Sequence, residues 1–485
     1  MNSEKKIKSS YKLESNIDPM EKKPNIFGVR HIQCIYMCFG MIFGYFLRVN
    51  ISAAVVYMLK PTVDGVPYYD WDPATKNLLL SGFFWGYVVA QVPSGLLAKR
   101  YGGKITLAVS TLICGIVTLL HPIAARLGDW QLFLACRILV GLTQGTVYPC
   151  VHTLLAKWTP KPERSILGSF VYSGAQIGTV IILGTSGAFS ETSVGWPTIF
   201  FFSGACAVVW SLLYLFFGLD GPEDSKSISI AEREYILHHT GSGNNNVQKN
   251  LPVPWGALFT SLPFYALILA HCGFTWGFYF LLTEIPSYLA GALGLEVNKN
   301  ALLSALPYFV MWVLCFVMSP ISDYLINSGK LSVANSRKLF NSLGQWVPMI
   351  CLIVCGYMSA DQNVGAIICL TIGVGFNSAS FSGYMINHMD LSPNFAGTMM
   401  GITNGFSNLL SIFAPLLVSV VVVDERRQDQ WRIVFFITAG VYLVCNTCFV
   451  IFGRATVQSW NEPKTTISVA NLTENENKDE KEMVK

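Results

Sequence analysis

Twelve long apolar segments, separated by short polar stretches, constrain this 485-residue chain more than any other feature. A helix needs about 20 apolar residues to cross the hydrocarbon core of a bilayer. Charged residues make up 13% of the chain, whereas soluble proteins carry about 25%. The sequence therefore predicts an all-α membrane protein with twelve transmembrane helices. They are expected near residues 32–59, 77–98, 105–125, 130–156, 165–189, 197–219, 258–292, 301–325, 339–359, 364–388, 396–423 and 430–453.

The longest gap between apolar segments divides the helices equally. Residues 220–257 are charged and then rich in Gly, Ser and Asn, which is typical of a linker. Twelve helices split six and six favour a duplicated transporter. The expected regions are a leader (1–31), an N-terminal half (32–219), the linker (220–257), a C-terminal half (258–453) and a disordered tail (454–485).

Lys and Arg residues gather on one side of the predicted helices. The leader, the even-numbered loops and the tail hold 24 of the 33, and the odd-numbered loops hold seven. Cytoplasmic loops carry the basic excess in membrane proteins, so both termini and the linker should be cytoplasmic. The two remaining cations, Arg48 and Arg137, fall inside predicted helices.

Composition and motifs disfavour several other classes of protein. A net charge of +4 is too small to indicate nucleic-acid binding. All thirteen cysteines lie in apolar runs, where neither a disulfide framework nor a zinc site is expected. HExxH, GxSxG and P-loop patterns are missing from the sequence. We therefore expect no metal, no cofactor and no enzymatic activity.

A charged motif recurs after the second and eighth predicted helices. Both copies have a small residue, three positions, a charged residue and then a basic turn with glycine. The first contains Gly95, Arg100, Gly102 and Lys104, and the second contains Asp323. This pattern resembles the loop motif G-x-x-x-D-R-x-G-x-K/R of the major facilitator superfamily. The first copy departs from it because a lysine stands at the acidic position.

Longer stretches resemble one family of that superfamily, the anion:cation symporters that include vesicular glutamate transporters, sialin and sodium-phosphate cotransporters. The similar stretches are spread over residues 30 to 463, and the forms TEIPSYL and VQSWNEP are most similar to insect members provisionally named inorganic phosphate cotransporters. They are WDPATKNLLLSGFFWGYVVAQVPSG (71–95), GLTQGTVYPCVH with KWTPKPERS (141–165), TWGFYFLLTEIPSYL (275–289) and GFNSASFSGYMINHMD with FAGTMMGITNG (375–405).

The resemblance implies two pseudo-symmetric six-helix halves with an anion site between them, worked by alternating access. The implied function is cation-coupled symport of a small anion, either inorganic phosphate or an organic anion. Proton-coupled transport of acidic sugars or amino acids, as in sialin, is the alternative. A channel or a non-transporting receptor also stays open. Because glutamate-carrying members have His, Glu and Arg where Leu80, Gln144 and Phe274 stand here, vesicular glutamate transport is disfavoured.

Arg48 is the leading candidate for binding the anion. It lies 11 residues before the predicted end of its helix, about 16 Å deep at 1.5 Å per residue, where a lone charge is costly unless it faces a wet cavity. Arg137 is shallower and either binds substrate or packs. The full substrate-binding set is Arg48, Arg137, Gln144, Tyr148, Tyr279 and Asn377.

Two further groups of residues are expected to couple and gate transport. A structural or gating role is expected for the motif residues Gly95, Arg100, Gly102, Lys104 and Asp323, and for His152 and His388 near helix ends. Neutral oxygens can hold sodium, and a carboxylate can carry a proton. The coupling-ion candidates are Asn50, Ser52, Asn404 and Asn408 for sodium, which we favour, and Glu284 for protons. We expect the protein to be a monomer. We expect it in the plasma membrane rather than in lysosomes or vesicles, because neither tail has an acidic dileucine signal.

The basic asymmetry makes a testable prediction of topology. Epitope tags at either terminus should be labelled by antibody only after cells are permeabilised, because both termini are expected in the cytoplasm. A tag in the loop after the first helix should be labelled on intact cells. Labelling of a terminal tag on intact cells would contradict the assignment.

Overall fold

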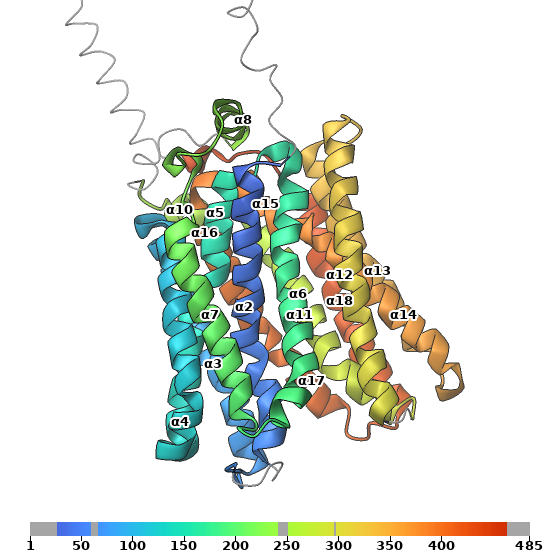
Figure 1. Ribbon diagram of the computed structural model, residues 1–485. Coiled ribbons are helices and arrows are strands. Elements are labelled where there is room, and N and C mark those ends of the chain that lie inside the picture. Colours follow the sequence, from blue (N-terminus) through green and yellow to red (C-terminus); the bar gives the residue numbers. More distant parts are fainter. Residues whose placement is uncertain (1–26, 60–65, 241–250, 295–296, 463–485) are drawn as a thin grey trace, which may run out of the picture.

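The computed structural model describes residues 27–59, 66–240, 251–294 and 297–462, and its helices run roughly parallel as one bundle (Figure 1). These described residues contain helices and no strand. Most of the leader and residues 463–485 of the tail lie outside them, as do residues 241–250 of the linker. The prediction of an all-α membrane protein is confirmed.

The first half of the chain forms six crossings of the bundle. α4 holds two spans in one assigned helix, because Gly128 and Asp129 have non-helical backbone angles and reverse the chain. The helices are α2 (Val29–Met58), α3 (Pro73–Tyr101), α4 (Gly103–Gln144), α5 (Val147–Trp158), α6 (Arg164–Ser190) and α7 (Pro197–Phe217). α5 continues the second span of α4 toward the end of the bundle where α2 begins.

The second half also makes six crossings, two of them through broken helices. α14, a short 3-10 turn and α15 make one span, and α16 with α17 make another. The helices are α11 (Leu262–Gly291), α12 (Val297–Asn327), α13 (Val333–Cys355), α14 (Asn363–Phe376), α15 (Tyr384–Leu391), α16 (Ala396–Ser411), α17 (Phe413–Val421) and α18 (Gln428–Phe452).

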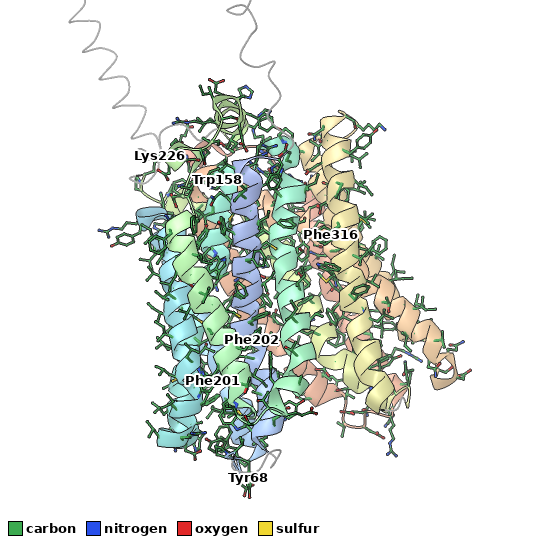
Figure 2. The ribbon with its side chains drawn as sticks, in the orientation of Figure 1. Tyr68, Trp158, Phe201, Phe202, Lys226 and Phe316 are labelled. Carbon is green, nitrogen blue, oxygen red and sulfur yellow. The ribbon has the colours of Figure 1, made fainter. Side chains whose placement is uncertain are left out.

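Length and hydropathy support twelve spans. Ten helical stretches in the described part of the chain are long and apolar enough to cross a membrane, and one of them, Gly103–Trp158, covers two crossings. α3 is not among the ten, although it runs alongside them for 29 residues. Phe201 and Phe316 on the outer surface are about 40% exposed, as expected for a face that meets lipid (Figure 2).

Glycines let α3 and the second span of α4 pack backbone to backbone. A Cβ atom at Gly141 would lie 1.9 Å from the Phe83 carbonyl oxygen, and one at Gly86 would lie 2.0 Å from the Ile138 carbonyl oxygen. Small residues at helix crossings allow this close approach in membranes. Gly141 lies on the same span as Arg137, and this close packing brings that cation against α2 and α3.

The linker and the first part of the tail are more ordered than their composition suggests. The linker contains α8 (Ile230–Thr240) and α10 (Trp255–Phe259), which lie at the end of the bundle where α2 begins (Figure 1). The prediction of disorder was wrong for residues 454–462. The Gln458 backbone N–H donates to the Leu391 carbonyl over 2.9 Å, and the Ser392 hydroxyl donates to Asn461 Oδ1 over 2.7 Å. The overall polar composition of the tail does not reveal a few specific hydrogen bonds such as these.

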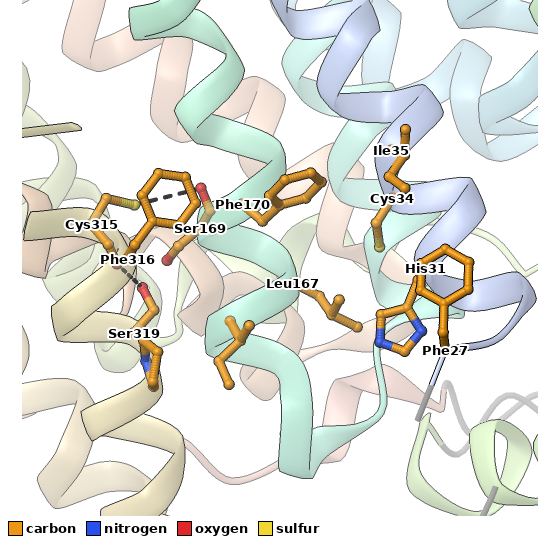
Figure 3. Close-up of a pocket in the computed structure, with 12 residues that line it drawn as sticks. Phe27, His31, Cys34, Ile35, Leu167, Ser169, Phe170, Cys315, Phe316 and Ser319 are labelled. Atoms are coloured by element: carbon orange, nitrogen blue, oxygen red, sulfur yellow. Dashed lines mark hydrogen bonds between the residues drawn. The ribbon is translucent and has the colours of Figure 1, made fainter. Parts of the chain in front are cut away.

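A groove of about 260 Å³ opens between α2, α6 and α12 (Figure 3). Leu167, Phe170 and Phe316 line it, and the Cys315 thiol donates to the Ser169 carbonyl across it over 3.6 Å. Its lining is almost wholly apolar, which excludes it as the site of a hydrated anion.

Candidate functional site

Arg48 lies where the two halves meet, inside a cage of aromatic rings. Its guanidinium donates to the hydroxyl of Tyr279, which comes from the other half. The guanidinium carbon lies 4.9 to 6.0 Å from five ring centroids, which belong to Tyr45, Phe83, Phe84, Tyr87 and Tyr279. The side chain keeps partial exposure, so the cage is open on one side.

This cage stabilises a cation without neutralising it. Each ring face contributes on the order of 0.5–2 kcal/mol of attraction, but a ring carries no net negative charge that would neutralise the guanidinium. Among the described residues, Arg48 has no carboxylate within 4 Å. A planar guanidinium with free donors can bind an oxyanion through two parallel hydrogen bonds.

A hydrogen-bonded chain links this site to helices of both halves. The Tyr279 hydroxyl donates to Asn408 Oδ1 over 3.5 Å, and the Asn408 amide donates to Asn404 Oδ1 over 2.9 Å. The Asn404 amide in turn donates to the Tyr87 hydroxyl over 2.8 Å and to Gln91 Oε1 over 2.9 Å. α3 and α16 therefore cannot separate without breaking the hydrogen bonds of Asn404. These bonds connect to Tyr87 and Tyr279, which both contact Arg48.

Arg137 and Gln144 are placed behind the cage rather than in it. Arg137 is 1% exposed and donates over 3.4 Å to the carbonyls of Leu47 and Arg48 and to Asn50 Oδ1. The Gln144 amide donates to the Gly44 carbonyl over 2.7 Å. Of the two roles considered for Arg137, this geometry favours packing, since its donors hold the α2 backbone in position.

Tyr148 and Asn377 lie on opposite sides of the centre. The hydroxyls of Tyr148 and Tyr45 are 2.8 Å apart, so Tyr148 belongs to the shell around Arg48. Asn377 is fully buried in the second half and accepts from the Tyr442 hydroxyl over 3.3 Å. Its amide nitrogen has no hydrogen-bond partner among the described residues.

The sodium candidates do not converge on one place. Asn50 is fully buried and donates to Ser203 Oγ over 3.2 Å, while its oxygen faces the guanidinium of Arg137. Ser52 is exposed, because positions two apart on a helix point in nearly opposite directions. Asn50 and Ser52 therefore point in different directions, and a cation at Asn50 would be repelled by Arg137.

Glu284 and the Asn404–Asn408 pair are the remaining coupling candidates. Glu284 is partly exposed near the far end of α11 and accepts from the Thr283 hydroxyl over 2.9 Å. Asn404 and Asn408 belong to the chain that leads to Arg48.

The two halves are locked together at the end of the bundle that carries α8. Asp390 of the second half accepts from Arg164 of the first half over 2.8 Å and from Arg337 over 2.7 Å, and all three are buried. Asp323 accepts from the backbone amides of Ser165 and Ile166, at 3.1 and 2.8 Å, which caps the start of α6. We call Asp390 with Arg164 and Arg337 the gate triad.

The other motif residues lie at the same end. A Cβ atom at Gly95 would lie 2.7 Å from the Thr398 Cα, so α3 meets α16 backbone to backbone. Gly102 turns the chain with a φ of 91°, and the Lys104 amide donates to Asp220 over 3.2 Å. Arg100 is exposed and packs on Tyr101. Gly95 and Gly102 thus have structural roles, while Arg100 forms no ion pair with the second half among the described residues.

His152 and His388 meet across the halves just inside the gate triad. Their ring centroids are 5.1 Å apart, and His271 of α11 lies 6.2 Å from His388. Neither His271 nor the gate triad was predicted from the sequence. A titratable residue inside an apolar helix was the available signal for His271, but nothing in the sequence showed that the three histidines converge.

Hydrogen bonds between the halves gather toward the α8 side of the bundle. Among the residues with assigned positions, they lie at the level of Arg48 and Tyr279 or nearer to the gate triad.

The gate triad yields a prediction about stability. Asp390→Asn should lower the free energy of unfolding by about 3–5 kcal/mol, because it leaves two buried guanidinium groups without their carboxylate. Asp429→Asn is the matched control, since Asp429 pairs with Arg427 at the surface, where both side chains are 58% exposed. Thermal unfolding of the purified proteins should show a large drop for the first variant and little change for the second. Equal shifts would contradict the assignment of a buried ionic lock.

Comparisons with known proteins agree with this architecture. The family model of the Major Facilitator Superfamily matches residues 37–415. The proton:xylose symporter XylE has the same fold, with a TM-score of 0.67 at 15% identity over 88% of this chain and 96% of its own.

Relatives in sequence narrow the family further. A Drosophila melanogaster protein provisionally named an inorganic phosphate cotransporter is 38% identical over 92% of this chain and 89% of its own length. Human sialin is 33% identical over 91% of this chain and 92% of its own. Human vesicular glutamate transporter 2 is 31% identical over 90% of this chain and 76% of its own length. The chain therefore belongs to the anion:cation symporter family of the major facilitator superfamily, whose members are transporters and not enzymes.

Proposed function

We propose that this chain is a symporter that carries a small anion, inorganic phosphate or a small organic acid, by alternating access driven by a cation gradient. The observation that supports the proposal most strongly is Arg48, a cation between the halves that is surrounded by aromatic rings and has no described carboxylate partner. A bound anion supplies the missing charge. The names of the relatives, which refer to phosphate, sialin and glutamate transport, agree with an anionic substrate.

A small anion fits better than glutamate. Phe274, where glutamate carriers have an arginine, packs against the rings of Phe278, Phe381 and Tyr384 at 5.4 to 6.0 Å between centroids. Leu80 lies partly buried among apolar side chains. The site therefore offers one accessible guanidinium rather than two, which suits a compact oxyanion held by a single bidentate contact.

Sodium is the coupling ion that we propose first. Moving an anion into a cell that is negative inside costs about 2.3 kcal/mol per charge per 100 mV, so an importer at the plasma membrane needs co-transported cations. Gln144 and Leu80 cannot titrate, and Asn404 with Asn408 offers neutral oxygens near the anion. Protons are the second candidate, favoured by the partly exposed Glu284.

The proposed role of Arg48 is tested by uptake into proteoliposomes. A panel of radiolabelled anions that includes phosphate, lactate, urate and sialic acid identifies the substrate class. With the best substrate, Arg48→Ala should abolish uptake, and Arg48→Lys should retain only a small part, because Lys offers a point charge without the planar pair of donors. Arg48→Gln that folds and transports at the normal rate would place the anion elsewhere.

The coupling ion is tested by imposing one gradient at a time. Uptake under an inward sodium gradient at equal pH should exceed uptake under a pH gradient without sodium. Asn408→Ala should weaken the sodium dependence, since it removes an amide oxygen next to the site. The reverse ranking, with uptake eliminated by Glu284→Gln, would make this chain a proton symporter.

A further inference from the structure

Three buried histidines meet between the Arg48 cage and the gate triad, and neither the sequence motifs nor the proposed anion site gives them a role as a group. His152 comes from α5, His271 from α11 and His388 from α15, with exposed fractions of 0%, 3% and 0%. His152 Nε2 lies 2.8 Å from the Met385 carbonyl oxygen, which is a hydrogen bond between the two halves. We call these residues the histidine cluster.

The hydrogen bonds fit a cluster in which all three rings are neutral. Nε2 of His152 and Nδ1 of His388 both face the Met385 carbonyl, at 2.8 and 3.0 Å, so each nitrogen carries a proton. The remaining nitrogens then accept, His152 Nδ1 from the Tyr172 hydroxyl and His388 Nε2 from the Thr403 hydroxyl at 2.8 Å.

His271 completes this set. Its Nδ1 lies 3.0 Å from Thr403 Oγ1 and donates to it when the single hydroxyl proton of Thr403 goes to His388 rather than to the Met400 carbonyl oxygen 3.3 Å away. The bonds at these rings can thus be assigned without an extra proton.

An added proton would find no counter-charge in these surroundings. The titratable groups that face the cluster are Tyr172 from α6, Tyr384 from α15, whose ring lies 4.9 Å from that of His271, and Cys272 beside His271 on α11. α16 contributes the neutral Thr403, and Tyr148 on α5 stacks on Tyr172 at 5.8 Å.

The nearest charged group in sequence is already neutralised. Asp390 lies two residues from His388 but is bound by both arginines of the gate triad. Within the described chain, no carboxylate lies within 4 Å of the three rings. A charged imidazole here would be buried and unpaired, which is strongly unfavourable.

We propose that the histidine cluster is a proton-binding site, which takes up a proton when the gate opens toward the α8 side and must release it before the gate can close. Closing buries the three rings without a carboxylate to balance an added charge. Opening separates His152 from Met385 and admits water to the rings. By linkage, a ligand that binds only one of two states shifts the equilibrium toward that state, so acid on the α8 side holds the gate open.

The cluster also touches the shell of the anion site. The Tyr45 ring lies against Arg48, the Tyr45 hydroxyl meets that of Tyr148, and Tyr148 stacks on Tyr172, whose hydroxyl bonds His152. The inference rests on alternating access in the proposed function, but it requires no particular anion.

The test measures how often the gate opens, without any substrate. Thr398 is 1% exposed and packs against Gly95, so the thiol of Thr398→Cys can react only when the halves separate there. The purified protein is treated with N-ethylmaleimide at pH 7.5 and pH 6.0, and labelling of the peptide that contains position 398 is read by mass spectrometry. This readout separates the introduced thiol from the thirteen native cysteines.

The matched background replaces the rings by amides that keep a donor near the same place but cannot titrate: His152→Gln, His271→Asn and His388→Asn. Dividing each pH ratio by that of this background removes the intrinsic pH dependence of the thiol. The parent should then show at least about threefold more labelling at pH 6.0, since each unit of pKa difference between two states changes their ratio tenfold.

Further variants keep the test decisive. If the triple variant does not fold, His271→Asn alone is compared with the parent and should show a smaller acid response, because it removes one titratable ring and keeps a donor to Thr403. Tyr172→Phe should retain the acid response, since it removes a hydrogen bond but no histidine. Equal pH ratios in the parent and the amide background would overturn the proposal, whether or not the anion and its coupling ion have been identified correctly.

Discussion

The charge of Arg48 is the constraint on which the rest of the arrangement depends. A guanidinium inside a membrane protein persists only where a cavity, a dipole or an opposite charge compensates for lost hydration. Here five aromatic rings and one tyrosine hydroxyl surround it, and these ligands come from both halves. An anion bound at Arg48 therefore interacts with both halves at once, which is the condition for a substrate to influence their relative position.

The buried arginines show how differently the same side chain is used. Arg164 and Arg337 share Asp390 and hold the gate closed. Arg137 donates to carbonyls of α2 and fixes the helix that presents Arg48. The cations that lock or support the structure are thus bound to fixed protein groups, while the cation of the cage keeps donors free. The proposed anion site is thus distinguished from the supporting arginines by its free donors, and not by the type of residue.

Much of the fold followed from the sequence, because lipid allows few solutions. The twelve spans were located from apolar length alone, and the buried position of Arg48 was inferred from its depth in an apolar helix. The details that the sequence did not show depend on side-chain direction and on contacts between distant segments. Asn50, a sodium candidate, faces Arg137, and nothing in the sequence indicated that Asp390 would bind Arg164, 226 positions away. Residues 454–462 were expected to be disordered because the tail as a whole is polar, and its composition does not show the few side chains that bind it to the bundle.

Anion binding to the purified protein tests the central claim most directly. A ligand that binds only the folded state raises stability by RT ln(1 + [L]/Kd), so the unfolding temperature should rise with the concentration of the transported anion at constant ionic strength. Arg48→Gln should abolish that rise, while Arg427→Gln, which alters an exposed ion pair, should preserve it. The account predicts a saturable stabilisation that depends on Arg48. An equal rise in the wild type and in Arg48→Gln would show that the anion binds elsewhere and would contradict it.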